Sequence, residues 1–446
     1  MSVTKQEAAE MPPSLPLLSS TVTFGRDPIG FFVKSYRRYG PVFRLRAFDF
    51  NLTVMLGARA HRAIFVDQAE KLSVRSGYRL LLSVMNDALL LADGERHAQQ
   101  KRLVQPAFHA RRIERYVEFM HRAAERRMAT WRDGMVVDVY GEARRMTLEV
   151  IMQVLTGADI SAEYDAFART LTYTFDYATK PNIQKWVRLD LPFTQYRRNR
   201  LARRQLDSML YTMIARRRAD GGHGDDVLSW LIAARDADGS ALSDAQVRDQ
   251  VLLLIYAGHD TATCSLAWAL HLLGCHPEAL GAIEQELKRF GDSSRIGMAE
   301  LADLVQLGMA IDETLRLYPP VWIGLRGVKA DFEFNEWRIP AGSSLMYSAA
   351  ASHRLPEVFP DPLRFDPQRF APERKARLDP FSYIPFGGGA HMCVGKPLAQ
   401  VELKVLLARL LSAWRFEPLH CGPVPMHYNP TLAPKHGLPM RLRRLR

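Results

Sequence analysis

A glycine-rich run around one cysteine is the feature of this sequence with the clearest chemical potential. Cys393 lies near the end of residues 386–395, which read FGGGAHMCVG. Three consecutive glycines let the backbone lie close against a flat partner, because no Cβ keeps the two apart. Pro397 follows at a position typical of a first helical turn, so Cys393 is expected just before a helix N-terminus. Amides and dipole at such an end stabilise a thiolate, which is a strong ligand for iron.

The alternative for any isolated cysteine is a small buried side chain without chemistry. We expect that role for the other three cysteines, Cys264, Cys275 and Cys421. No two cysteines form a C-x-x-C pair, so neither a zinc site nor a thioredoxin-like centre is indicated. A chain of 446 residues with only four cysteines is typical of the cytoplasm.

A polar segment interrupts a long apolar region of helical periodicity. It reads Ala257-Gly258-His259-Asp260-Thr261, and a glycine within a helix costs about 1 kcal/mol relative to alanine. One interpretation is structural: Gly258 allows close helix packing, and the Thr261 hydroxyl bonds the carbonyl of Ala257. The other interpretation is functional, with Asp260 and Thr261 delivering protons by general acid catalysis. His259 is expected to face packing or solvent.

A pair of opposite charges lies three residues apart in a further helical region. Glu313 and Arg316 share one helix face and can form an ion pair. Most such pairs are solvated, so this spacing alone says little about structure or function.

The apolar pattern predicts a mainly α-helical chain with small β-sheets. Ser243 and Gln246 form a capping box that begins a helix of about thirty residues, which Pro277 stops after residue 274. This helix is apolar nearly all round, so we expect it to cross the interior of a large domain. A second helix is expected from Pro397 to about Trp414.

Short strands and loops complete the predicted elements. The strands are residues 41–46, 52–56, 331–334 and 344–347. A turn at residues 340–342 is expected to join the last two strands. Residues 220–226 are interpreted as a surface loop between helices, with a domain boundary as the alternative.

Together, these motifs resemble those of the cytochrome P-450 family in order and spacing. Residues 386–395 match the family's haem-binding signature, with Phe386, His391, Cys393 and Gly395 at its defined positions. The resemblance implies one catalytic domain over residues 1–446, with a proline-containing lead at residues 1–20. It also implies haem b (iron protoporphyrin IX) buried between the long central helix and the cysteine loop, with the Cys393 thiolate on its iron.

The resemblance assigns roles to residues far from the cysteine. Asp260 and Thr261 match the oxygen-binding motif, which relays protons during oxygen activation. Glu313, Arg316 and Arg369 match a buried charge triad that supports the region behind the cysteine loop.

Basic residues at family positions are the expected partners of the haem carboxylates. They are His97, Lys101, Arg326 and His391. Lys101 stands where arginine is usual and cannot form a bidentate contact, so Arg102 is an alternative.

Three variable stretches correspond to the family's substrate-facing segments. They are residues 77–91, residues 175–193, and residues 321–325 together with 429–432. The expected pocket residues are Ala257, Val321, Trp322, Ile323 and Thr431. An apolar lining suits a lipophilic molecule, although a core role is equally expected for each residue.

The substrate class stays open among sterols, terpenoids and fatty acids. Residues 318–353 resemble the sterol-demethylase branch of the family, but Asp260 stands where that branch typically has histidine.

Composition bears on partners and location. The formal net charge of +12 attracts acidic partners or anionic lipid, but no nucleic-acid-binding motif is present. No stretch approaches the ~20 apolar residues of a membrane anchor, so a soluble cytoplasmic protein is expected. Any membrane contact would be peripheral, with the arginine-rich residues 197–204 as one candidate.

The expected reaction inserts one oxygen atom from O2 into a lipophilic molecule. The chain leaves no room for a fused reductase after the cysteine helix, so a separate ferredoxin or flavodoxin is expected to supply electrons. Two alternatives remain: a peroxide-driven or rearranging haem-thiolate enzyme, and a haem sensor or carrier without catalysis. The Asp260-Thr261 pair favours oxygen activation.

Overall fold

The chain forms two compact units. The computed structural model describes residues 23–47, 50–158, 164–179, 190–222, 224–236, 238–291, 296–428 and 430–445. The expected lead at residues 1–20 lies outside these residues. Unit 1 comprises Met1–Arg79, Val321–Arg364 and Ala376–Cys393. Unit 2 comprises Leu80–Pro320, Phe365–Lys375 and Val394–Arg446.

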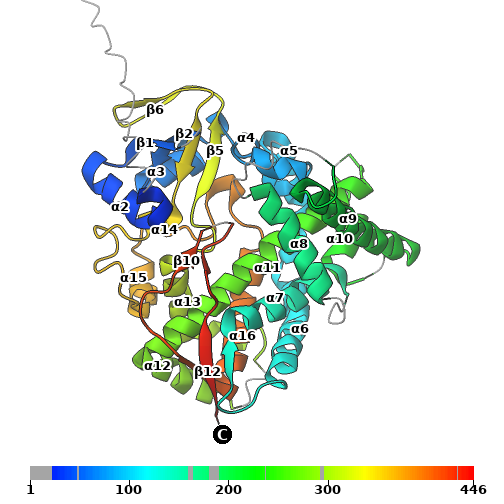
Figure 1. Cartoon of the computed structure of the whole chain (residues 1–446), viewed down its shortest axis with the longest axis vertical. Helices are drawn as coiled ribbons and strands as arrows, with labels where there is room; N and C mark the ends of the chain where they lie inside the picture. Colours follow the sequence, from blue (N-terminus) through cyan, green and yellow to red (C-terminus); the bar gives the residue numbers. More distant parts are fainter. Residues whose placement is uncertain are drawn as a thin grey trace, which may run out of the picture. The chain divides into compact units, whose positions relative to one another are not determined.

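Unit 1 is built on a five-stranded sheet with the order β1-β2-β8-β5-β3 (Figure 1). The strands are β1 (Val42–Ala47), β2 (Phe50–Met55), β8 (Ser344–Tyr347), β5 (Gly324–Val328) and β3 (Leu72–Ser73). The predicted pair at the start is confirmed, because β1 and β2 are antiparallel neighbours. β2 pairs in parallel with β8, so segments about 290 residues apart in the sequence share this sheet.

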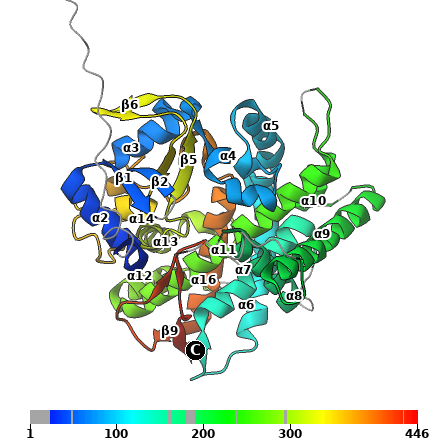
Figure 2. The same ribbon diagram turned by 45° about the horizontal axis from the view of Figure 1, so that its top comes forward.

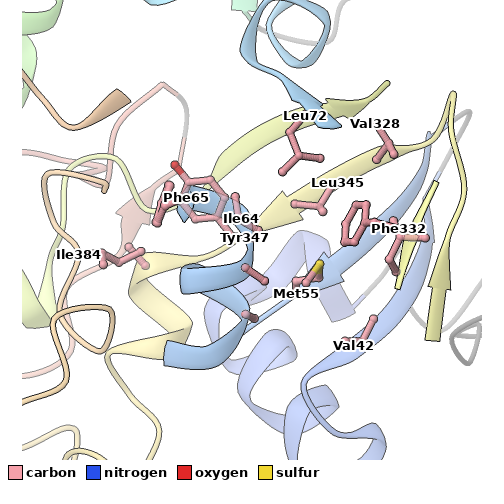
Figure 3. Packing of buried hydrophobic residues seen from close by; sticks show 14 residues of the cluster. Val42, Met55, Ile64, Phe65, Leu72, Val328, Phe332, Leu345, Tyr347 and Ile384 are labelled. Carbon is pink, nitrogen blue, oxygen red and sulfur yellow. The ribbon is translucent and has the colours of Figure 1, made fainter. Parts of the chain in front are cut away.

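One face of this sheet packs apolar side chains into a core (Figure 3). Met55 from β2 and Leu345 from β8 are fully buried there. Phe65, from the helical segment η1 (Ala63–Asp67), lies in the same cluster with its ring against that of Tyr347. Full burial of one such side chain stabilises the fold by roughly 1.5–3 kcal/mol.

Residues 340–342 were predicted to join the strands at residues 331–334 and 344–347, and this prediction is wrong. β6 (Phe332–Phe334) pairs instead with β7 (Trp337–Ile339), a strand that is not among those predicted. The connection is a tight turn in which Asn335 has a positive φ of 54°. Asparagine tolerates that conformation, which makes the two-residue hairpin accessible. Residues 340–342 therefore join β7 to β8.

Unit 2 is organised around the helix α11 (Asp244–Cys275). The predicted capping box is confirmed: the Ser243 amide donates to Gln246 Oε1, and the Gln246 amide donates to Ser243 Oγ. Most side chains of this 32-residue helix are buried. The helix ends before α12 (Pro277–Lys288), whose first residue lacks the amide needed to continue α11.

The helix α7 (Val139–Thr156) packs along α11, and both figures show the two side by side (Figures 1 and 2). A Cβ on Gly258 would lie 2.7 Å from Cδ1 of Ile151. The close helix approach predicted at Gly258 is therefore confirmed. The hydroxyls of Thr147 and Thr263 also hydrogen-bond across this contact at 2.7 Å.

Further helices and two small sheets complete unit 2. The helices are α5 (Gly94–Val104), α6 (Ala110–Met128), α8 (Tyr164–Thr179), α9 (Gln195–Ala219), α10 (Val227–Ala233), α13 (Val305–Leu317) and α16 (Lys396–Ala413). One sheet joins β4 (Val136–Asp138), β12 (Pro439–Arg444) and β9 (Trp414–Pro418), and the other joins β10 (Met426–His427) and β11 (Ala433–Pro434). The described residues 220–222 and 224–226 lie between α9 and α10, as predicted for a loop. No helix among the described residues combines the length and apolarity that a membrane span requires.

A buried ion network ties α13 to the short helix η9 (Pro367–Phe370). Glu313 and Arg316 are both 0% exposed, and Arg316 Nε and Nη2 donate to the two Glu313 oxygens at 2.7 and 2.8 Å. Arg369 Nε lies 3.5 Å from Glu313 Oε1, which also accepts the amide of Asp366 at 2.9 Å. The predicted charge triad is thus present as an interior network, and solvent does not screen it.

A disulfide joins Cys275, at the end of α11, to Cys421, in the segment after β9. The expectation that both are free buried cysteines is therefore wrong. The two positions are 146 residues apart, and nothing local to either cysteine reveals that the fold brings them together. Cys264 was also expected to be a free buried cysteine, and this is confirmed: it forms no disulfide and is fully buried.

We predict that Glu313→Ala lowers the free energy of unfolding by about 3–5 kcal/mol, because Arg316 is left charged and buried without its partner. Urea unfolding followed by circular dichroism measures this change. The matched control is Glu284→Ala, which removes a surface ion pair with Arg415 and should cost less than about 1 kcal/mol. Equal shifts of the two midpoints would contradict a structural role for the network.

We predict that Cys421→Ser lowers the melting temperature under non-reducing conditions. A cross-link that closes a loop of 146 residues restricts the unfolded chain, which stabilises the native state by up to about 5 kcal/mol. The difference from the wild type should vanish in dithiothreitol. Four alkylated thiols in denatured, unreduced wild-type protein, instead of two, would show that the bond does not form.

Candidate functional site

The cysteine loop is shaped by its contact with one aromatic residue of unit 1. A Cβ on Gly388 would lie 2.9 Å from Cδ2 of Phe65, and one on Gly389 would overlap the Phe65 carbonyl. Gly387 and Gly389 also have positive φ angles of 70° and 62°. The glycines therefore permit both the turn and the close approach to Phe65.

Cys393 follows this turn with its backbone held and its side chain exposed. Its amide donates to the carbonyl of Phe386 at 3.0 Å, which closes the loop between two signature residues. The side chain is outside the disulfide and accessible. α16 begins three residues later, as predicted from Pro397. A sulfur donor presented by a fixed backbone fits the iron ligand that the resemblance implies.

Arg326 lies in the same part of unit 1. It projects from β5, is buried, and places its guanidinium 5.9 Å from the Phe65 ring centroid and 5.5 Å from that of Tyr347. Its Nη1 donates to the carbonyl of Leu325 at 2.8 Å. Among the described residues, no carboxylate lies within ion-pair distance of Arg326. A buried guanidinium is stabilised by an anionic partner, so this residue fits a haem carboxylate.

His97 and Lys101, which are also expected to bind the haem carboxylates, lie one turn apart on α5 in unit 2. His97 is buried, and burial lowers its pKa, with the nearby charge of Lys101 lowering it further. Arg102 is largely exposed and pairs with Asp236 at 3.5 Å. Lys101 thus lies close to His97, whereas Arg102 has an acidic partner on the surface. His391, the fourth expected partner, lies in the short helix η10 (Gly389–His391) of the cysteine loop.

Polar side chains in the segment 257–261 of α11 form hydrogen bonds with backbone carbonyls of the protein. The Thr261 hydroxyl donates to the Ala257 carbonyl at 2.6 Å, as predicted. His259 is buried with Nε2 3.2 Å from the Arg144 carbonyl, so its expected packing role is confirmed. Burial lowers the pKa of His259 to about 4, against the opposing effect of Asp260, so the ring is neutral near pH 7.

Asp260 has a partner that the sequence did not reveal. The hydroxyl of Thr431 donates to Asp260 Oδ2 at 2.6 Å, and the Cys264 thiol donates to Thr431 Oγ1 at 3.4 Å. Thr431 lies between β10 and β11 and is buried. Since 171 residues separate Asp260 from Thr431, no local pattern could have indicated this contact.

The remaining candidates for the substrate pocket have different environments. Trp322 is 4% exposed, packs against Phe32 of α2 (Pro28–Tyr39), and accepts the Ser348 hydroxyl through its carbonyl. This placement favours the core role for Trp322. Val321 and Ala257 are exposed, and Ile323 is half-buried. Residues 180–189 and 429 of the expected substrate-facing stretches lie outside the described residues.

Comparison with known proteins identifies the relatives of this chain. The family model described as Cytochrome P450 matches residues 10–441. Cyclooctat-9-en-7-ol 5-monooxygenase of Streptomyces melanosporofaciens is 31% identical over 92% of this chain and 89% of its own length. Pentalenene oxygenase of Streptomyces avermitilis is 29% identical over 92% of this chain and 91% of its own length.

A solved structure agrees with these sequence relatives. Retinoic acid bound cyanobacterial CYP120A1 aligns with a TM-score of 0.87 and 28% identity, over 98% of this chain and all of that chain. The mainly helical architecture with small sheets is therefore the cytochrome P450 fold. The chain belongs to the cytochrome P450 family and is a haem-dependent oxidoreductase of its monooxygenase type.

Proposed function

We propose that this protein inserts one oxygen atom from O2 into a lipophilic, terpenoid-like molecule, with its two units acting as one catalytic domain. The observation that carries the proposal is the Cys393 loop, which presents a sulfur atom from a backbone fixed by Phe386 and Phe65. As a ligand of haem iron, the Cys393 thiolate would supply the electron donation that oxygen activation requires.

The residues that would hold haem b are those that match the family's motifs. The Cys393 sulfur would ligate the iron. Arg326 and His391 of unit 1, and His97 and Lys101 of unit 2, would bind the haem carboxylates through charge-assisted hydrogen bonds. When bound, the haem supplies the iron at which dioxygen is activated.

Proton delivery is assigned to Asp260 and Thr261. Asp260 is partly accessible, so its carboxyl can exchange protons with solvent. The Thr261 hydroxyl donates to Ala257, which leaves its oxygen as an acceptor for a proton donor such as water. In this role Asp260 passes protons inward and Thr261 orients the donor.

The terpenoid preference is supported by the relatives. Their names specify cyclooctat-9-en-7-ol, pentalenene and retinoic acid, which are all hydrocarbon-rich isoprenoids. The apolar residues of the expected substrate-facing stretches suit such molecules. Binding of a sterol or fatty acid panel with higher affinity than terpenoids would redirect this assignment.

Electrons are proposed to come from a separate ferredoxin or flavodoxin-type protein. Exposed basic residues on α5 and α6, including Arg102 and Arg111, would steer an acidic partner. A peroxide-driven enzyme would need no such donor. Comparing turnover with a reductase system against turnover with hydrogen peroxide separates the two, and turnover with peroxide alone would overturn this part of the proposal.

We predict that Cys393→Ala abolishes the thiolate-type absorption band of the reduced, CO-bound protein, because no sulfur remains for the iron. The matched control is Cys421→Ser, which removes a cysteine elsewhere and should keep the band. Retention of an unchanged spectrum in Cys393→Ala would overturn the proposed ligation. A normal spectrum without any oxygenated product from a broad lipophilic panel would instead favour the haem sensor or carrier.

We predict that Thr261→Ala lowers the product formed per electron consumed and raises hydrogen peroxide release, because the proton donor loses its orientation. Thr261→Ser keeps the hydroxyl and should restore most of the coupling. The measurement compares reductant consumed, product and peroxide with a tightly bound substrate. Unaltered coupling in Thr261→Ala would count against the relay.

A further inference from the structure

Two hydrogen bonds in series lead from Cys264 of α11 to the Asp260 carboxylate within unit 2. The Cys264 thiol donates to Thr431 Oγ1 at 3.4 Å, and the Thr431 hydroxyl donates to Asp260 Oδ2 at 2.6 Å. Each member donates toward the next, so Asp260 is the final acceptor. Hydrogen bonds aligned in one direction polarise and strengthen one another.

The donors of this series keep their protons. Burial raises the pKa of the Cys264 thiol well above its ordinary value. The thiol is therefore protonated near neutral pH and can donate to Thr431. Thr431 does not titrate, so the hydroxyl facing Asp260 is available in every protonation state of its neighbours.

Thr431 itself is held by the fold. The indole Nε1 of Trp268 donates to the Leu432 carbonyl at 2.9 Å, and the Leu432 amide donates to the Pro320 carbonyl at 3.0 Å. These bonds attach the backbone next to Thr431 to α11 and to Pro320, which follows α13. The hydroxyl is thus presented to Asp260 from a segment whose backbone is bonded on both sides of the Leu432 peptide.

The polar side chains next to Asp260 on α11 have hydrogen-bond partners of their own. The Thr261 hydroxyl donates to Ala257, and the ring of His259 lies at the Arg144 carbonyl. Among the described residues, the hydrogen bond from Thr431 is the one that Asp260 accepts from a side chain. The orientation of the carboxylate is therefore set from the C-terminal segment and not from α11 alone.

We infer that Thr431 is a positioning residue for proton delivery: its hydroxyl holds the Asp260 carboxylate in the orientation from which protons are passed. The inference rests on the proposed role of Asp260. It adds a second role to Thr431, which is also expected to line the substrate pocket, and it makes Thr431 part of the proton-delivery apparatus.

The test compares Thr431→Val, which keeps the shape and removes the donor, with Thr431→Ser, which keeps the donor. In Thr431→Val, product per electron should fall about tenfold, as for loss of a hydrogen bond to a charged group, with a larger solvent isotope effect on turnover. Thr431→Ser should restore coupling. Substrate affinity, measured by spectral titration, should change less than twofold in both variants.

The matched control is Thr263→Val, which removes another buried threonine hydroxyl of unit 2 that bonds Thr147 and the His259 carbonyl. It should lower stability without lowering coupling. A crystal structure of Thr431→Val gives a readout independent of activity, and it should show the Asp260 side chain rotated away from residue 431.

Three outcomes would overturn the inference. These are unchanged coupling in Thr431→Val, weakened substrate binding with normal coupling, and an unmoved Asp260 in the crystal. A wild-type protein that lacks the thiolate-type spectrum would instead refute the proposed function. Each variant must therefore show the wild-type CO spectrum before its coupling is compared.

Discussion

Burial of α11 is the constraint on which the rest of unit 2 depends. In a helix of 32 residues that is buried along most of its length, most of the polar side chains are cut off from water. Each of those side chains needs a partner inside the protein, since an unsatisfied buried group costs about 1–3 kcal/mol. Gly258 lets α7 approach closely enough to supply some of these partners, and the C-terminal segment supplies Thr431. The polar segment is therefore arranged by packing before any chemistry takes place.

The same requirement shapes the other buried polar residues. Glu313 accepts hydrogen bonds from Arg316 and from the amide of Asp366, so its charge is compensated without solvent. Arg326 is a counterexample within the described residues, because it is buried beside aromatic rings without a carboxylate. Its environment suits an acidic cofactor, just as the exposed sulfur of Cys393 suits a metal.

Sequence reasoning succeeded where the determining contacts are local. The capping box at Ser243, the bond from Thr261 to Ala257 and the pair of Glu313 with Arg316 each span three or four residues. The cysteine loop was recognised because its glycines are consecutive. The failures involve distant contacts, since only the complete fold brings together Cys275 with Cys421 or Asp260 with Thr431. β7 was not predicted for a different reason. The two residues that connect it to β6 are Asn335 and Glu336, and without a glycine this turn gives no hairpin signal.

The disulfide also affects how the chain responds to cleavage. It encloses residues 276–420, and every part of unit 1 after Arg79 lies within that loop. A protease that cuts an exposed turn there, such as the one at Asn335, produces two polypeptides that stay covalently joined. The amino-terminal fragment, which contains α11, would stay linked through Cys275 to the carboxyl-terminal fragment, which contains Cys421. The two fragments would separate only after the disulfide is reduced.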